Sequence, residues 1–214
     1  MTRIAHASDL HGNLAPLFAM VERDGQPDVW VLTGDIFPNE SRGIVEIEVP
    51  FQGQWAADFR AELAEIFGTT PVVTVPGNHD YVDLAAILRE LGVDAHAVSE
   101  TAPATVAGHS FGGFRHIPWV AGEWNGETHE FAAVIDQVFS QDIDILVTHA
   151  PAAGILDDGG HSYGIGELAT ALCYRPHRIV AHFFGHIHQC GGQSVEEMGI
   201  QFHNGAETCR MIEV

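Results

Sequence analysis

One pattern recurs along this chain of 214 residues and constrains its fold more than any other feature. An apolar run ends in Asp, His or Asn beside Gly or Pro. The clearest case is the β-branched run from Pro71 to Val75, which leads into Pro-Gly-Asn-His-Asp. Such runs, bounded by turn residues, are typical of buried strands. The pattern occurs at residues 8–12, 34–35, 77–80, 148–151 and 185–188. Because α/β proteins bind ligands at the carboxyl ends of their strands, we expect one functional rim.

The motif at residues 77–80 also has a simpler interpretation. Asn78 and Asp80 are good helix caps, and a helix is expected to start near Tyr81. Taken alone, this motif favours neither interpretation. Its recurrence at five strand ends favours a functional role.

The segments between the motifs predict an α/β fold. Residues 2–8 and 29–33 are strand-like, and apolar residues recur at helical spacing from Leu14 to Val21 between them. This β-α-β order implies parallel strands and a right-handed crossover. Short β-type runs around glycines at residues 101–120 predict hairpins and a second sheet.

The rest of the chain continues this alternation. Further strands are expected at residues 71–75, 93–98, 143–148 and 178–184, with tail strands near 193–198, 200–203 and 208–213. Helices are expected at residues 55–66, 81–91, 127–139 and 165–174, whereas residues 37–50 are expected to be irregular. Neither an internal repeat nor a linker interrupts the sequence, so we expect a single domain over residues 1–214.

Charge and hydropathy exclude several classes of protein. The formal net charge is −20, lysine is absent and all nine cations are Arg, which argues against extended nucleic-acid binding. Whether this composition is adaptive or genomic stays open. No run approaches the 18 or so apolar residues that a transmembrane helix needs, and the N-terminus lacks an apolar signal segment. We therefore expect a cytoplasmic protein without a membrane partner.

The side chains at the strand ends offer a mixed set of nitrogen and oxygen ligands. The candidates are Asp9, His11, Asp35, Asn78, His149, His186 and His188. Imidazole and carboxylate together suit Mn, Fe, Zn or Ni better than Ca or Mg. Seven ligands exceed what one catalytic ion needs but suit two ions that share a carboxylate. Two ions about 3.5–4 Å apart can stabilise both oxygens of an in-line phosphoryl displacement and activate water.

The ordered motifs resemble the calcineurin-like metallophosphoesterase superfamily. The five blocks are Asp9-x-His11, Gly34-Asp35, Gly77-Asn78-His79-Asp80, Thr148-His149 and Gly185-His186-x-His188. The resemblance implies a two-sheet αββα sandwich with a binuclear metal site at the carboxyl ends of the strands. It implies two divalent transition-metal ions, with Mn favoured and Fe, Zn or Ni as alternatives.

The same resemblance implies a role for each motif residue. The first metal would be held by Asp9, His11, Asp35 and His188, and the second by Asn78, His149 and His186, with Asp35 as the bridge. His79 would be the catalytic histidine, which protonates the leaving oxygen or stabilises charge on the phosphoryl group. Asp80 would orient the His79 ring.

Departures from subfamily patterns indicate a small phosphodiesterase-like member. Protein serine/threonine phosphatases of this superfamily carry Asp-Arg-Gly after Gly-Asp, whereas this chain has Ile36-Phe37-Pro38-Asn39. We expect a metal-dependent phosphoesterase that cleaves phosphodiester or phosphomonoester bonds of small substrates by attack of a metal-bound hydroxide. A protein phosphatase and a nuclease are the alternative enzymes. A non-catalytic metal-bound scaffold is a further alternative, although it would not need His79.

Two residues outside the five blocks are candidates for substrate binding. His161 lies in a glycine-rich loop after His149, and Asn39 lies just beyond Asp35. A solvent-exposed loop histidine is the simpler interpretation of His161. The sequence leaves open the native metal, the physiological substrate, the preference for diesters or monoesters, and the oligomeric state.

Overall fold

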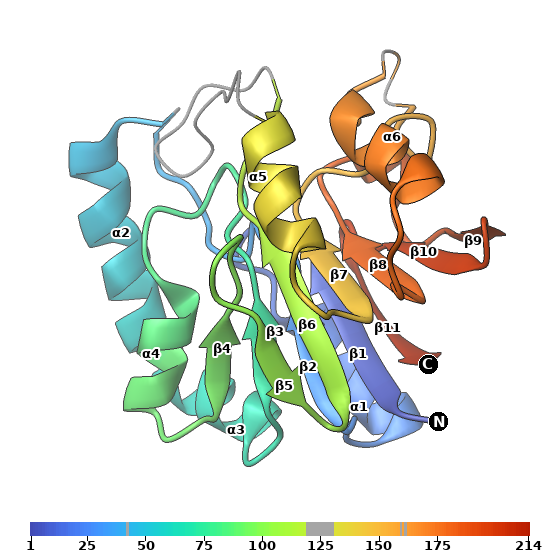
Figure 1. Cartoon of the computed structure of the whole chain (residues 1–214). Coiled ribbons are helices and arrows are strands. Elements are labelled where there is room, and N and C mark those ends of the chain that lie inside the picture. Colours follow the sequence, from blue (N-terminus) through green and yellow to red (C-terminus); the bar gives the residue numbers. More distant parts are fainter. Residues whose placement is uncertain (42, 119–130, 159, 161) are drawn as a thin grey trace.

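Two β-sheets packed face to face form the centre of the computed structural model, which describes residues 1–41, 43–118, 131–158, 160 and 162–214. Helices cover the outer face of each sheet, which gives the predicted αββα sandwich (Figure 1). The first sheet has the strand order β11-β1-β2-β3-β4, and the second has the order β5-β6-β7-β8-β10-β9.

The strands follow the predicted runs closely. They are β1 Arg3–Ser8, β2 Val29–Leu32, β3 Val72–Thr74, β4 Ala95–Ala97, β5 Ala104–Val106, β6 His109–Phe114, β7 Ile145–Thr148, β8 Ala181–Phe184, β9 Ser194–Glu197, β10 Ile200–Asn204 and β11 Thr208–Glu213. The helices are α1 Ala15–Asp24, α2 Val45–Asp58, α3 Arg60–Phe67, α4 Leu84–Glu90, α5 Phe131–Phe139 and α6 Gly166–Tyr174, with a short 3₁₀ turn at His188–Cys190.

Strand direction places the functional motifs on one rim. In the first sheet, β1, β2, β3 and β4 run parallel, and only β11 is antiparallel to its neighbour β1. In the second sheet, β6, β7, β8 and β10 run parallel, with β5 and β9 antiparallel at the two edges. The motifs follow β1, β2, β3, β7 and β8, so each lies at a carboxyl end.

Three apolar layers hold the sandwich together. Between the sheets, residues such as Val31, Val73, Ile145 and Phe183 are fully buried. Helices α1, α3 and α4 pack on the outer face of the first sheet, and α5 and α6 pack on that of the second. Strands buried on both faces read as continuous apolar runs, which is why they were recognisable in the sequence.

Helix α2 corrects the prediction for residues 37–66. The sequence indicated an irregular stretch to residue 50 and one helix over 55–66, but α2 begins at Val45 and a separate helix, α3, follows after Phe59. Two features hid α2. Pro50 lies inside it, where proline removes a backbone hydrogen bond. Its buried face is also polar, so the usual apolar stripe is missing.

The start of α4 removes the simpler interpretation of the motif at residues 77–80. The N-cap of α4 is Asp83, whose side chain accepts a hydrogen bond of 3.0 Å from the Ala86 N–H. Asn78 and Asp80 are therefore not caps of this helix.

None of the helices in the described part of the chain combines the length and apolar character needed to cross a bilayer.

Candidate metal centre

The loops that leave the strands adopt an uncommon backbone conformation. Among the described residues, eight non-glycine residues have positive φ, and four of these are predicted ligands. They are Asp9, His11, Asp35 and His186, with φ between 45° and 67°. This region disfavours L-residues by roughly 1–2 kcal/mol each, and strain of this kind clusters at functional sites. The loops after β1 and β2 support one another, since the Asp9 N–H donates to the Gly34 carbonyl and the His11 N–H to that of Asp35.

Two glycines allow the loops to approach this closely. A Cβ atom on Gly77 would collide with the backbone and side chain of Asp35. A Cβ atom on Gly185 would collide with Ser8 and with the carboxylate of Asp9. The glycines in these two blocks are therefore required by the packing of one ligand loop against another.

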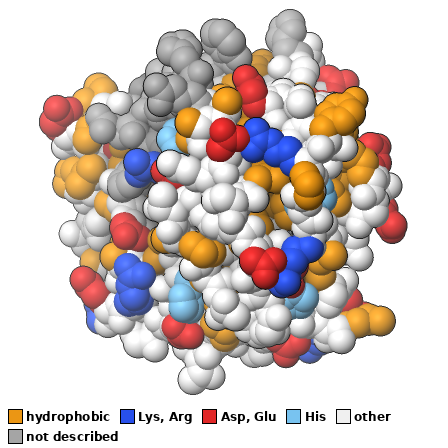
Figure 2. Space-filling view, viewed as in Figure 1, with side chains coloured by type: hydrophobic (Ala, Val, Ile, Leu, Met, Phe, Trp, Pro, Cys, Tyr) orange, Lys and Arg blue, Asp and Glu red, His pale blue; other side chains and the backbone are white. Residues whose placement is uncertain are grey.

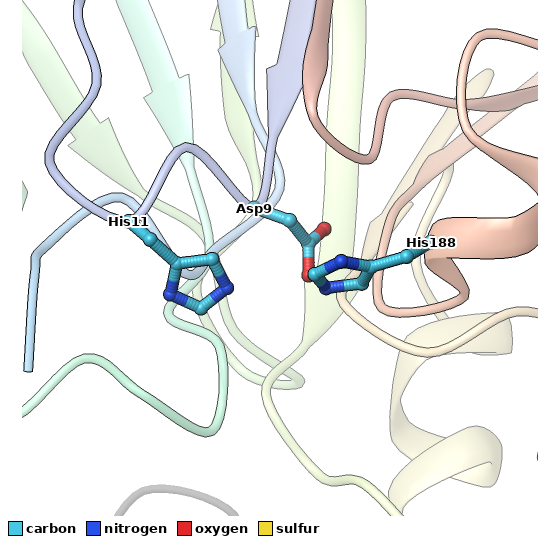
Figure 3. Close-up of side chains that lie close together, drawn as sticks. All are labelled: Asp9, His11 and His188. Carbon is cyan, nitrogen blue, oxygen red and sulfur yellow. The ribbon is translucent and has the colours of Figure 1, made fainter.

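The first ligand cluster consists of Asp9, His11 and His188 (Figure 3). Their ligand atoms lie within 4.8 Å of one another. Asp9 Oδ1 is buried, accepts no hydrogen bond from the described residues, and lies 3.3 Å from His188 Nε2. His188 Nδ1 donates to Glu207 Oε1 at 3.0 Å, the arrangement typical of a metal-ligating histidine. These atoms fit a divalent cation.

The second cluster consists of Asp9, Asp35 and His149. His149 Nδ1 donates a hydrogen bond of 2.6 Å to the Thr33 carbonyl, so the lone pair of the neutral ring is on Nε2. That atom lies 3.1 Å from Asn78 Oδ1 and 3.5 Å from Asp35 Oδ2. These ligand atoms therefore converge in a buried space, where a proton on Nε2 or a metal ion in its place can offset the charge of the carboxylates.

His186 completes the predicted set of seven. The backbone N–H of His186 donates to Asp9 Oδ2 at 2.8 Å, and the ring centroid of His186 lies 5.0 Å from that of His149. The structure thus brings all seven predicted ligands to one rim. Asp9 belongs to both clusters and Asp35 to one of them, so the assignment of Asp35 as the bridge stays a prediction.

The pKa values describe the same accumulation of negative charge. Burial alone would lower the pKa of His149, but Asp35 and Asp9 outweigh it and raise this pKa to about 10. Contact with Asp9 likewise raises the pKa of His188 to about 9. Burial, reinforced by the neighbouring His149, lowers the pKa of His186 to about 4. The two carboxylates thus hold protons on neighbouring imidazoles, and a bound metal ion would displace those protons.

His79 is exposed at the edge of the ligand set. The backbone N–H of His79 donates to Asp35 Oδ1 at 2.6 Å, and the ring centroid of His79 lies 5.1 Å from that of His11. Asp80 does not accept the expected orienting hydrogen bond from the His79 ring. Both oxygens of Asp80 instead accept backbone N–H groups, those of Asp35, Ile36, Phe37 and Gly77, at 2.8–3.2 Å.

Asp80 therefore shapes the loop after β2, because one buried carboxylate holds the loop that carries Asp35. Burial and the nearby Asp35 carboxylate raise the pKa of Asp80 to about 6, and its bonds from Gly77 and Phe37 oppose the rise. Its role is structural support of a ligand loop.

The two candidate substrate contacts have different outcomes. Asn39 is half-buried, and its Nδ2 donates to the His79 carbonyl at 3.2 Å. Contact of Asn39 with substrate stays a prediction. His161 lies outside the described residues.

Sequence reasoning missed two residues that support the site. Glu207 follows all five blocks in the sequence and bonds to His188. Gln52, on α2, bonds to the His79 carbonyl. Neither belongs to a local motif, so only the tertiary fold reveals them.

Comparison with known proteins agrees with this geometry. A family model described as calcineurin-like phosphoesterase matches residues 2–190. One solved crystal structure aligns with a TM-score of 0.65 and 15% identity, over 99% of this chain and 98% of that chain, which shows a shared fold. A conserved uncharacterized protein from Streptococcus pneumoniae TIGR4, named as a predicted phosphoesterase, aligns with a TM-score of 0.42 and 15% identity, over 97% of this chain and 74% of that chain. The search among curated proteins gave no match. Because the family model covers most of the sequence, this chain belongs to the calcineurin-like phosphoesterase family, whose members are metal-dependent phosphoester hydrolases.

Proposed function

We propose that this protein hydrolyses phosphodiester or phosphomonoester bonds of small substrates with the help of two divalent transition-metal ions, Mn²⁺ first among them. The observation that carries the proposal is the convergence of carboxylate, imidazole and amide ligand atoms in two adjacent clusters that share Asp9. Asp9 Oδ1 is buried without a hydrogen bond from the described residues, and His149 Nε2 faces two oxygens.

We assign the ligands to two ions as the family resemblance implies. The first ion would be held by Asp9, His11, Asp35 and His188, and the second by Asn78, His149 and His186, with Asp35 shared. When bound, two such ions would supply Lewis acidity toward the phosphoryl group and make water a nucleophile near neutral pH. The protein's own contribution is a fixed ligand set, since hydrogen bonds already join the loops that carry these side chains.

His79 is the group that handles the leaving oxygen. Its ring is exposed beside His11, while its N–H is tied to Asp35, so the imidazole projects from the ligand set toward solvent. An imidazole at this place can donate a proton to the departing alkoxide. General acid catalysis of this kind contributes on the order of 10²–10⁴-fold in rate.

Surface charge favours a small substrate over a nucleic acid. On the face shown in Figure 2, Arg side chains lie beside carboxylates rather than in a continuous basic patch. Arg175 pairs with Asp136, and Arg178 pairs with Asp142 at 3.1 Å. With a net charge of −20, the protein as a whole repels a polyanion. The missing Asp-Arg-Gly stretch counts against the protein phosphatase alternative.

Metal analysis combined with a substrate panel tests the proposal. The panel contains bis-p-nitrophenyl phosphate, p-nitrophenyl phosphate, cyclic nucleotides, a phosphoserine peptide and single-stranded DNA. We expect turnover of small esters, its loss after chelation, recovery with Mn²⁺, and about two ions per chain. Full activity in a metal-free sample would contradict the mechanism, and faster cleavage of the peptide or DNA would favour an alternative.

A further inference from the structure

Helix α2 buries two polar side chains, Glu48 and Gln52, and exposes several apolar side chains to solvent. Glu48 and Gln52 have no exposed surface, whereas Ile47 and Val49 are 40% and 41% exposed. Residues four apart lie on the same face of a helix, so Glu48 and Gln52 point together into the protein. A segment that breaks the usual pattern in this way is expected at a functional site.

Gln52 makes three hydrogen bonds through its amide, all of them to the loops of the candidate site. Its Nε2 donates to the His79 carbonyl at 2.6 Å and to the Pro38 carbonyl at 3.2 Å. Its Oε1 accepts the Tyr81 N–H at 2.7 Å. One side chain therefore joins the loop after β2 to the loop that carries His79.

Glu48 fixes the other end of the same loop. Its carboxylate accepts the Glu40 N–H at 3.1 Å, the Ser41 N–H at 2.9 Å and the Ser41 hydroxyl at 2.8 Å. The Pro38 carbonyl that Gln52 contacts is thus part of a segment that is itself held in place. The two polar residues form a brace between α2 and the site.

The backbone of His79 is held on both sides, and its ring is not. The N–H donates to Asp35 Oδ1, and the carbonyl accepts from Gln52 and Asn39. Among the described residues, none makes a hydrogen bond with the His79 ring. The oxygens of Asp80 accept backbone N–H groups instead. The position of the imidazole therefore depends on its backbone.

We propose that Gln52 is a positioning residue for His79, which sets the imidazole at the leaving oxygen through the His79 carbonyl. This inference rests on the proposed function, because it assumes that His79 protonates the leaving group. Gln52 is too deeply buried to contact substrate itself.

The test is a double-mutant cycle of Gln52→Met and His79→Ala, measured on esters with poor and good leaving groups. Methionine is close to glutamine in length and removes all three hydrogen bonds. Since misplacement by about 1 Å can cost roughly 10²-fold, we expect Gln52→Met to lower kcat about 10–100-fold on an alkyl phosphate ester. On a p-nitrophenyl ester, which needs little protonation, the loss should be below about threefold. Metal content should stay at the wild-type value.

Non-additivity is the decisive readout. If Gln52 acts through His79, the double variant should be no slower than His79→Ala alone. Gln54→Met is the matched control, since Gln54 lies on the same helix, is exposed and, among the described residues, its side chain bonds only to Asp58. We expect the control to match the wild type on both esters.

Each remaining outcome has one meaning. Equal losses on both esters, or losses that multiply in the double variant, would show a merely structural role and overturn the inference. If His79→Ala alone retains full activity on the alkyl ester with metal bound, the role proposed for His79 fails, and the inference fails with it. If Gln52→Met does not fold, Asn39→Ala decides, because it removes the other donor to the same carbonyl from a half-buried position. It should then lower kcat by about 2–5-fold on the alkyl ester alone. Loss of the predicted substrate contact of Asn39 would instead raise KM on both esters, and an equal fall in kcat on both esters would overturn the inference.

Discussion

The two sheets contribute different chemistry to the candidate metal centre. The first sheet delivers both carboxylates, Asp9 and Asp35, together with His11 and Asn78. The second sheet delivers imidazoles only, those of His149, His186 and His188. All the formal negative charge of the ligand set thus comes from one side of the sandwich. The second sheet would supply imidazoles, which are neutral when they bind a metal ion.

Hydrogen bonds cross between the sheets at this rim. The ring of His149 donates to the Thr33 carbonyl, and the backbone N–H of His186 donates to the Asp9 carboxylate. The ligand loops of the two sheets are therefore registered against each other by the protein alone. The hydrogen bonds hold the loops of both sheets in place, but only the first sheet contributes negative charge. We therefore expect the candidate ligands of the first sheet to matter most for metal affinity.

Removal of a first-sheet charge should have the largest effect. We expect Asp35→Asn to lose metal and activity together, with kcat/KM reduced by at least about 10³-fold, because a neutral amide is a poor ligand between two cations. Metal content by mass spectrometry and kcat/KM on a p-nitrophenyl ester measure both. If this variant retains two ions per chain, the carboxylates of the first sheet do not dominate metal affinity.

Removal of a second-sheet imidazole should cost less. His186→Ala deletes a neutral ligand and leaves both carboxylates in place, so we expect it to weaken one metal site with a loss on the order of 10²-fold. Titration of the metal-free variant with Mn²⁺ should recover activity at high concentration. If excess Mn²⁺ rescues Asp35→Asn as readily as His186→Ala, the two sheets contribute equally.

A residue that acts through a ligand should have a smaller effect still. Glu207→Gln keeps a hydrogen bond to His188 Nδ1 but removes the negative charge behind it. Since Glu207 is largely exposed, we expect metal affinity to fall about tenfold, at the lower end for residues that support a ligand. Competition for Mn²⁺ with a fluorescent chelator measures this change, and an unchanged affinity would show that Glu207 merely occupies space near the site.

What the sequence could predict was local. A buried parallel strand is an apolar run, and each of the seven candidate ligands follows such a run within a few residues, so both the sheets and these candidates were recognisable. The supporting contacts are not local. Gln52 lies 27 residues before His79, Glu207 lies 19 residues after His188, and Asp80 bonds to backbone groups 43–45 residues away. These contacts exist only because the elements pack together, and the inverted face of α2 contradicted the pattern by which helices are recognised.

Beneath the metal centre, the two sheets are alike. His6 on β1 bonds to the Thr33 hydroxyl at 2.9 Å, and His182 on β8 bonds to the Thr148 hydroxyl at 2.8 Å. The Thr148 hydroxyl donates its own proton to the Ala150 carbonyl, so His182 Nε2 must be the donor, and burial keeps the ring neutral by lowering its pKa to about 3. His182 Nδ1 is then buried without a hydrogen-bond partner among the described residues. Each sheet thus carries a neutral, buried imidazole on a strand that leads into a loop with candidate ligands.

These histidines should make folding stability depend on pH. Burial, reinforced by His203, lowers the pKa of His182 to about 3, and burial also lowers the pKa of His6 well below its usual range. In the unfolded chain each ring has an ordinary pKa near 6.5. Below about pH 6.5 the unfolded chain therefore binds more protons than the folded protein, and stability falls as pH decreases. Each histidine contributes a loss of about 1.4 kcal/mol per pH unit, or about 2 kcal/mol on going from pH 7 to pH 5.

Glutamine substitutions separate this effect from that of the metal ligands. His182→Gln retains an N–H donor for Thr148 but cannot titrate, so the loss of unfolding free energy between pH 7 and pH 5 should shrink by about 2 kcal/mol relative to the wild type. His6→Gln should give a similar reduction, because the two pairs have the same chemistry. Urea unfolding of chelated samples at pH 7, 6 and 5 measures both, and the shared titration of the ligands cancels in the difference between variant and wild type. A reduction in only one variant would show that the sheets differ beneath the metal centre as well as at it, and no reduction in either would show that the buried rings are not the source of acid sensitivity.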